Sequence, residues 1–396
     1  MAGGESLRVY PAEVDAGLAF RQVTGQKIRA GLRSEDQPSG SSCATYYPAF
    51  DYLRLVLVII VAAYHSGLIA REQPAYYALQ IFFALSGWLI GGILLRSKPA
   101  DLPRFYFNRA ARIWIPYFTA IVLFIAVSVS QGHITAKWME IFFYDSTFVY
   151  DFFGAPQLAV YKDVMPLRGT GNHFWSIGAE EQFYLLAPLL MTLLPGKIGK
   201  TIWFWSLLSV AALSLHYWHY FGSISLGVLA AVLRSHFGDW HLTRGGRSAL
   251  AIIAVVGVVA PCWGLVAYRI GEPLCCVSIV LFLAQAGRPS KIASFVGGVS
   301  YPMYLNHWIG LFAANGIFGL FGWQNAWYRG LSGVLIALAI AMILYVAIDG
   351  NVQKSRQHYY TVLRGRMAAV AGFALVAVGI VGGLGLALAA GLAPAQ

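Results

Sequence analysis

The sequence predicts an all-α protein, a polytopic transmembrane helical bundle with about ten core helices and one more at its C-terminus. Only 11% of its 396 residues are charged, whereas soluble domains carry about 25%. The mean hydropathy is +0.62, and apolar runs recur that approach the ~20 residues a helix needs to cross a bilayer. The net charge of +11 arises in short stretches between these runs, which is the distribution that orients membrane helices.

The first predicted element, residues 1–46, is a cytoplasmic tail, because charges of both signs and a Ser-Gly-Ser-Ser stretch replace the apolar pattern there. No cleavable signal peptide is visible. The spans follow, and the shorter ones must borrow flanking residues to cross the bilayer. They are 52–70, 76–95, 113–130, 182–194, 201–217, 219–233, 249–268, 274–286, 303–321, 330–348 and 367–392.

Three loops rich in Arg and Lys, 96–112, 234–247 and 349–366, are predicted to be cytoplasmic. This places the N-terminus inside, residues 131–181 in a long outer or re-entrant loop, and the C-terminus outside. We therefore expect a multi-pass protein of the cell inner (plasma) membrane. Nucleic-acid binding is excluded, because no contiguous soluble basic surface exists to carry it. The last span has no charge and many small residues, so residues 367–396 are predicted to be dispensable for catalysis.

Two polar residues mark the first span, Arg54 and His65. Eleven positions separate them, which places both on one helix face about 16 Å apart along its axis. With Arg54 near the cytoplasmic interface, His65 would lie near mid-membrane, where an ionisable residue is costly and is a functional candidate. Packing against a neighbouring helix is the alternative.

Three further segments are ambiguous on their own. Arg109 and Arg112 share a helix face at a membrane boundary, where guanidinium groups suit phosphates or merely anchor the helix to lipid. Glu180 and Glu181 precede an apolar span, where they could counter a buried charge or cap a helix. Ser300, Tyr304 and His307 follow at helical spacing, as a site or an interfacial aromatic belt would. The four cysteines form no C-x-x-C pair, so no metal site is predicted.

Together and in this order, these segments resemble the acyltransferase 3 family of membrane-bound O-acyltransferases, which modify sugars and cell-surface polymers. The resemblance covers about residues 47–350. Its motifs are the Arg-x10-His of Arg54 and His65, Phe83-x-Leu-Ser-Gly, the Arg-x-x-Arg of Arg109 and Arg112, Trp175-Ser-x-x-x-Glu-Glu-Gln-Phe-Tyr, and Ser300-Tyr-x-x-Tyr-Leu-x-His307.

The resemblance implies transfer of a small acyl group, often acetyl from acetyl-CoA, to a hydroxyl of a sugar, glycolipid or surface polysaccharide. His65 would be the general base and Arg54 its structural or electrostatic partner. Glu180 and Glu181 would line the catalytic site. No soluble esterase-like domain follows, so the stand-alone form of the family is expected.

The resemblance also implies which residues meet the substrates. No cofactor is expected to be tightly bound, since acyl-CoA is a donor substrate, and the expected partners are a carbohydrate or glycolipid acceptor and membrane lipids. Arg109 and Arg112 would face the coenzyme A phosphates. The candidates for substrate binding are Trp175, Ser176, Tyr304 and His307.

The predicted organisation has four parts: the tail 1–46, an acyltransferase domain 47–350, a basic cytoplasmic loop 351–366 and an extra C-terminal helix 367–396. No Gly-x-Ser-x-Gly elbow occurs, so direct transfer is favoured over a serine acyl-enzyme. A transporter or flippase of a lipid-linked or sugar substrate is the alternative, because His and Arg within a membrane also suit proton coupling.

Overall fold

The computed structural model describes residues 45–130, 134–154, 172–214 and 220–389. These residues form helices and connecting turns, with no strand among them, which confirms the all-α prediction. The α-helices are α1 (Pro48–His65), α2 (Gln73–Leu94), α3 (Leu102–Ser130), α4 (Ala136–Ser146), α5 (Tyr150–Phe153), α7 (Trp175–Thr192), α8 (Ile202–Ser214), α9 (Tyr220–Phe237), α10 (Arg244–Cys262), α11 (Tyr268–Leu283), α12 (Lys291–Leu320), α13 (Ala326–Leu344), α14 (Gly350–Tyr359) and α15 (Val362–Ala389).

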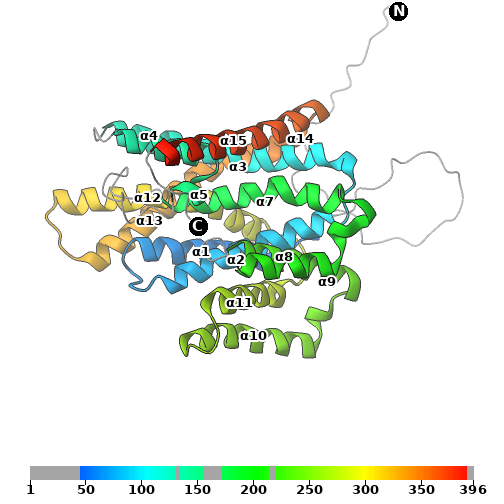
Figure 1. Ribbon diagram of the computed structural model, residues 1–396. Coiled ribbons are helices and arrows are strands. Elements are labelled where there is room, and N and C mark those ends of the chain that lie inside the picture. The colour runs from blue at the N-terminus through cyan, green and yellow to red at the C-terminus, as the bar shows by residue number, and fades with distance from the viewer. Residues whose placement is uncertain (1–44, 131–133, 155–171, 215–219, 390–396) are drawn as a thin grey trace, which may run out of the picture. The chain divides into compact units, whose positions relative to one another are not determined.

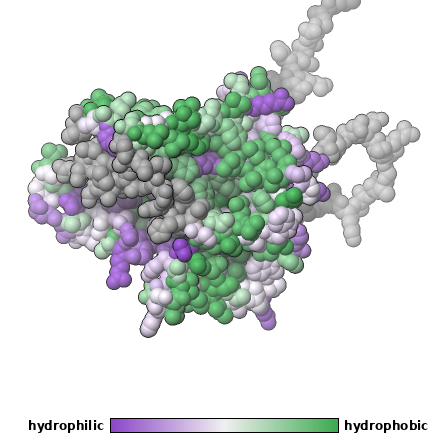
Figure 2. Space-filling view, in the orientation of Figure 1, coloured by the Kyte–Doolittle hydropathy of each residue, from purple (hydrophilic) through white to green (hydrophobic). Residues whose placement is uncertain are grey.

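The long helices lie side by side, and their connections gather at the two ends of the bundle (Figure 1). Six helical segments within the described residues are long and apolar enough to cross a membrane. Apolar side chains cover the sides of the helices, while polar residues concentrate toward their ends (Figure 2). From Ile252 onward, most exposed side chains of α10 are Val and Ile, including Val255 and Val259. The protein is therefore a multi-pass membrane protein.

Within the described residues each predicted span falls on a helix, but several boundaries differ. Positions 215–217, 219 and 390–392 of the predicted spans lie outside the described residues. The first span was expected to reach residue 70, yet α1 ends at His65, because Gly67 turns the chain with φ +80° in the left-handed region. The predicted basic loops also contain helix. Residues 102–112 already belong to α3, and 350–359 form α14. Apolar runs mark only the part of a helix that can meet lipid, so polar first and last turns are missed.

Close approach of backbones fixes the helices around the interior. A Cβ on Gly87 of α2 would lie 2.0 Å from the carbonyl oxygen of Ile224 on α9, and one on Gly227 would lie 2.3 Å from that of Ala84. Only glycine permits this contact, which is how small residues drive helix packing in membranes. The outcome is that α2 is pressed against α9 on one side and presents Ser86 toward α7 on the other.

Candidate active site

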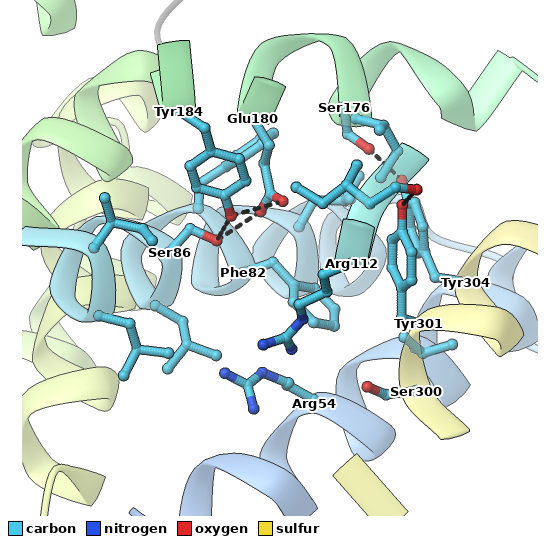
Figure 3. Close-up of a pocket in the computed structure, with 18 of the residues that line it drawn as sticks. Arg54, Phe82, Ser86, Arg112, Ser176, Glu180, Tyr184, Ser300, Tyr301 and Tyr304 are labelled. Atoms are coloured by element: carbon cyan, nitrogen blue, oxygen red, sulfur yellow. Dashed lines mark hydrogen bonds between the residues drawn. The ribbon is translucent and has the colours of Figure 1, made fainter. Parts of the chain in front are cut away.

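A cavity of about 140 Å³ opens between α1, α2, α3, α7 and α12 (Figure 3). Apolar side chains, among them Val58, Phe83 and Ile113, form much of its wall. Polar groups from all five helices converge on it, which is the usual character of a ligand site. They are Arg54, Ser86, Arg109, Arg112, Ser176, Glu180, Tyr184, Ser300, Tyr301 and Tyr304.

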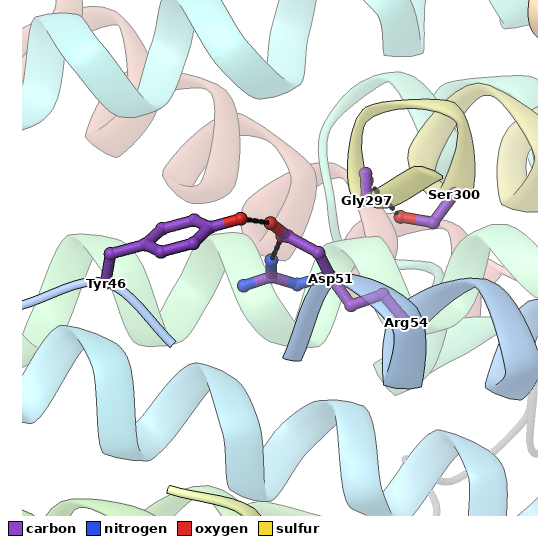
Figure 4. Close-up of polar contacts among 5 residues, drawn as sticks. All are labelled: Tyr46, Asp51, Arg54, Gly297 and Ser300. Carbon is purple, nitrogen blue, oxygen red and sulfur yellow. Dashed lines mark hydrogen bonds and ion pairs between the residues drawn. The ribbon is translucent and has the colours of Figure 1, made fainter. Parts of the chain in front are cut away.

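Arg54 is held at one wall by an acid from its own helix. Asp51 accepts from Arg54 Nη1 at 3.0 Å and from the Tyr46 hydroxyl at 2.6 Å (Figure 4). Gly297 of α12 packs against this carboxylate, and any Cβ there would collide with Asp51. The guanidinium is thereby held in place. It uses one N–H group on Asp51 and keeps further N–H groups as donors at the cavity.

Arg109 and Arg112 enter the same cavity from α3, as the sequence predicted for one helix face. The guanidinium of Arg112 faces that of Arg54 (Figure 3). Arg109 lies over the ring of Tyr184, 5.7 Å from its centroid, and its Nε is buried without a hydrogen-bond partner. Neither arginine forms an ion pair with another described residue. Buried donors are normally satisfied, so these two are suited to an anionic ligand.

The two adjacent glutamates of α7 separate in the structure. Glu180 faces the cavity, where Ser86 donates to it at 2.7 Å and Tyr184 at 3.1 Å. Glu181 does not line the cavity, contrary to the prediction for both residues. It is 3% exposed, and the indole of Trp114 on α3 donates to it at 2.8 Å. Consecutive helix positions differ by 100°, so both carboxylates could not face one site.

A second polar group adjoins the cavity at Tyr304. The Tyr304 hydroxyl lies 2.5 Å from that of Ser176 and donates to the carbonyl of His173 at 3.0 Å. His173 and His307 rings are 4.7 Å apart, and His307 stacks on His65 at 5.2 Å. Tyr304 thus belongs both to the cavity wall and to this cluster of three imidazoles, His65, His173 and His307.

The buried histidines have fixed tautomers. His307, 2% exposed, bonds through Nδ1 to the Tyr304 carbonyl at 2.9 Å. His173, 6% exposed, bonds through Nε2 to the Leu305 carbonyl at 3.2 Å. A carbonyl only accepts, so each bonded nitrogen carries the proton and the other ring nitrogen keeps a lone pair. His307 Nε2 can therefore accept a proton.

His65 is placed differently from the prediction. It ends α1 and is exposed, rather than lying part-way along a continuing helix. It does not line the cavity, and its link to the site runs through His307. Trp175 is likewise outside the cavity wall and packs on Phe83 and Tyr220. Six of the ten candidate residues do line it: Arg54, Arg109, Arg112, Ser176, Glu180 and Tyr304.

The sequence pattern did not indicate a role for four residues of this region: Asp51, Ser86, His173 and Tyr184. Ser86 is compatible with simple close packing, and Tyr184 and His173 stand in a motif without a distinguishing feature. Asp51 lies three residues before Arg54, its partner. Acidic residues one helical turn from an arginine are a usable signal for such a pair, whereas the partners of Ser86 come from a helix 94 residues away.

The fold and this internal site define a multi-pass membrane protein whose helices enclose a cavity lined by polar side chains. The chain belongs to the acyltransferase 3 family, whose model, described as an acyltransferase domain, matches residues 47–346. The family predicted from the motifs is therefore confirmed.

Curated relatives agree with this assignment. The chain is 30% identical to the peptidoglycan O-acetyltransferase OatA of Listeria monocytogenes over 37% of this chain and 24% of the relative. It is 32% identical to the O-acetyltransferase OatA of Staphylococcus aureus over 42% of this chain and 29% of the relative. A putative membrane-bound transacylase of Komagataeibacter xylinus is 21% identical over 76% and 81%. The chain thus spans under a third of the first two relatives. No solved structure gave a significant match.

Proposed function

We propose that this acyltransferase moves an acetyl group from acetyl-CoA to a hydroxyl of a cell-envelope carbohydrate. One observation carries the proposal: a single cavity joins a group of arginines to a hydroxyl pair backed by three histidines. The arginines suit a phosphorylated donor, and the histidines suit an alcohol that must lose a proton. A carbohydrate acceptor is supported by the name of the Listeria relative, a peptidoglycan O-acetyltransferase.

The donor would enter at the arginine end. Guanidinium groups bind phosphate oxygens through paired N–H bonds, and no carboxylate of the described residues forms an ion pair with Arg109 or Arg112. The apolar wall beyond them fits the uncharged pantetheine arm and the acyl group. We place this end on the cytoplasmic side of the inner membrane, together with the N-terminus, because the basic loops cluster there.

The reaction would take place near Tyr304. The acceptor oxygen attacks the thioester carbonyl carbon, a C–O bond forms, the C–S bond breaks, and the hydroxyl proton passes to an imidazole and then to the departing thiolate. His65 is the exposed imidazole that an acceptor can reach, and His307 lies directly behind it with a free ring nitrogen. The Ser176 and Tyr304 hydroxyls both donate to the His173 carbonyl, so either would have to turn away from that carbonyl to donate to the developing oxyanion.

A donor-binding assay tests the arginine half of this proposal. The purified full-length chain would be titrated with acetyl-CoA in a turnover assay that detects released CoA thiol in the presence of an oligosaccharide acceptor. Replacing Arg109 and Arg112 by Ala should raise the donor KM on the order of tenfold or more per residue, the value of a charge-assisted bond. The acceptor KM should stay near the parent's, and Lys should restore the donor KM only partly.

Two outcomes would contradict this. An unchanged donor KM in the double Ala variant would remove the phosphate assignment. Full recovery with Lys would show that these residues only anchor α3 at the membrane surface.

A further inference from the structure

A short helix outside the family match lies beside the arginines. The matched region ends at residue 346, and α14 (Gly350–Tyr359) follows it. Its sequence has the lowest mean hydropathy of the helices, so apolar packing does not explain its position. Arg356 of α14 is partly buried, and its Nε is shielded from solvent without a hydrogen-bond partner among the described residues.

Three polar contacts fix α14 against the start of α3. Gln357 accepts from Arg104 Nη2 at 2.8 Å and donates to Asn108 Oδ1 at 3.2 Å. Arg104 also lies over the ring of Tyr360, 5.6 Å from its centroid. Asn108 and Arg112 are four residues apart and therefore lie on one face of α3. The contacts thus hold α14 along the face from which Arg112 enters the cavity.

Arg356 precedes Gln357, whose side chain bonds to Asn108 on the face of α3 that carries Arg112. This contact holds Arg356 toward the end of the cavity that Arg109 and Arg112 line. None of these three arginines makes an ion pair or a side-chain hydrogen bond to another described residue.

The nearby carboxylates do not neutralise them by direct contact. Glu180 accepts from Ser86 and Tyr184, Glu181 from Trp114, and Asp51 from Arg54 and Tyr46. Asp349, which precedes α14, is buried and forms no ion pair with any described arginine. Like charges held together without direct counter-ions indicate a ligand with several negative charges.

We propose that Arg356 is a further donor-binding residue. It binds a second phosphate group of the acyl donor, distinct from the phosphate that Arg109 and Arg112 bind. Arg356 does not line the cavity, whereas the other two do, so it meets a part of the donor further from the acyl group. The donor class is accordingly a thioester that carries several phosphates, as coenzyme A does, rather than an acyl carrier without them. This inference rests on the proposed donor and extends it beyond the family match.

An anionic lipid headgroup offers the same phosphate chemistry, and the test must separate the two sources. The full-length chain would be purified in detergent without added anionic lipid and titrated calorimetrically with CoA and with pantetheine, which has no phosphate. The variants are Arg356→Gln, Arg356→Lys and Lys354→Ala. Lys354 is the matched control, because it lies on the same helix and is exposed. Thermal midpoints show whether each variant is folded.

We expect Arg356→Gln to weaken CoA binding about tenfold, the value of about 1.4 kcal/mol. Arg356→Lys should weaken CoA binding less, and Lys354→Ala should leave it unchanged. Pantetheine binding should be the same in all variants, because the lost contact is to phosphate.

Several results would overturn the inference. If Arg356→Gln binds CoA as well as Lys354→Ala does, while Arg109→Gln weakens it, the inference fails and the proposed donor site stands. If Arg356→Gln instead lowers only the amount of phosphatidylglycerol that co-purifies from cells, the residue binds lipid. If Arg356→Gln is unstable, the folded Arg356→Lys variant is compared with Lys354→Ala instead. Equal CoA affinity of these two variants would also oppose the inference. A parent chain that does not bind CoA would remove both proposals.

Discussion

The three histidines of the cluster differ in exposure: one ring is exposed and two are buried. His173 and His307 are buried and bonded to backbone carbonyls, so their orientation is fixed. His65 is exposed and stacks on His307, and among the described residues it forms no polar side-chain contact. Under the proposed function His65 would meet the acceptor, and His307 would orient His65 and could take up a proton. A positioning role for His307 and a catalytic role for His65 make different predictions.

Replacing His65 by Ala should abolish transfer without unfolding the chain. General-base catalysis contributes about 10²- to 10⁴-fold, and an exposed side chain at a helix end contributes little to packing. CoA release with and without acceptor would be measured for parent and variant, together with thermal midpoints.

His307 provides the comparison for His65. Its side chain is buried among Tyr304, His173 and His65, so His307→Ala should lower both activity and thermal midpoint. Parental turnover in folded His65→Ala protein would end the general-base assignment.

For the site, the sequence predicted which residues take part better than it predicted which residues contact one another. Arg54, Arg109 and Arg112 could be placed because helical periodicity puts each on a known face. The separation of Glu180 from Glu181 follows from the same periodicity and could have been predicted. The Ser176–Tyr304 contact joins residues 128 positions apart, and the position of Ser86 beside Glu180 depends on how α2 and α7 pack. No local pattern contains that information.

Among the elements, α2 is positioned by contacts at single glycines. Gly87 lies next to Ser86, at the point where α2 contacts Ile224 of α9. On α9, Gly227 packs in the same way against Ala84 of α2. The sequence suggested that Ser86-Gly87 lets two helices approach closely, and the structure identifies α9 as the partner.

Gly87→Ala should therefore destabilise the bundle and Gly92→Ala should not. The added methyl at residue 87 would meet backbone atoms of Ile224, which cannot rotate away, and overpacking costs roughly 1–3 kcal/mol. At Gly92, on the same helix, nothing lies within 4 Å of an added Cβ, and Ala improves helix propensity. Thermal midpoints in detergent compare the two, and equal midpoints would refute the packing account.

The C-terminal helix also packs against the elements that form the site. A Cβ on Gly365 of α15 would lie 2.2 Å from the Pro103 carbonyl oxygen, and Gly372 faces Leu185 and Trp114. The sequence predicted that residues 367–396 carry no chemistry, and no residue of α15 lines the cavity. The contacts add a role in stability that composition alone did not predict.

Truncation after Arg366 should accordingly lower the thermal midpoint and keep turnover per folded molecule close to the parent's. Trp114 loses a covering surface, but its bond to Glu181 does not involve α15. Turnover would be normalised to the folded fraction measured by size-exclusion chromatography. A truncated chain that is fully folded and inactive would show that α15 takes part in catalysis.

For the whole molecule, the placement of the site within the bundle matters most. The arginines approach from the end where the basic segments 96–112 and 349–366 lie, whereas His65 is at the opposite end of α1. Helix count and charge pattern could predict the membrane class and much of the bundle. They could not predict the cavity, because its shape depends on how five helices pack against one another.

This placement supports the proposal that an acyl group passes through the bundle from a cytoplasmic donor to a carbohydrate hydroxyl. An enzyme of this kind leaves an ester on the acceptor, whereas a transporter of the same substrate would leave the acceptor chemically unchanged. Analysis of the product therefore distinguishes an enzyme from a transporter, whereas the properties of the protein do not.

The most direct measurement is mass spectrometry of cell-envelope glycans from cells that lack the gene, complemented with the parent chain or with His65→Ala. We predict base-labile acetyl groups on a glycan in the parent-complemented cells, and their loss in both the deletion and the His65→Ala cells. Glycans with identical ester content in all three would contradict the claim.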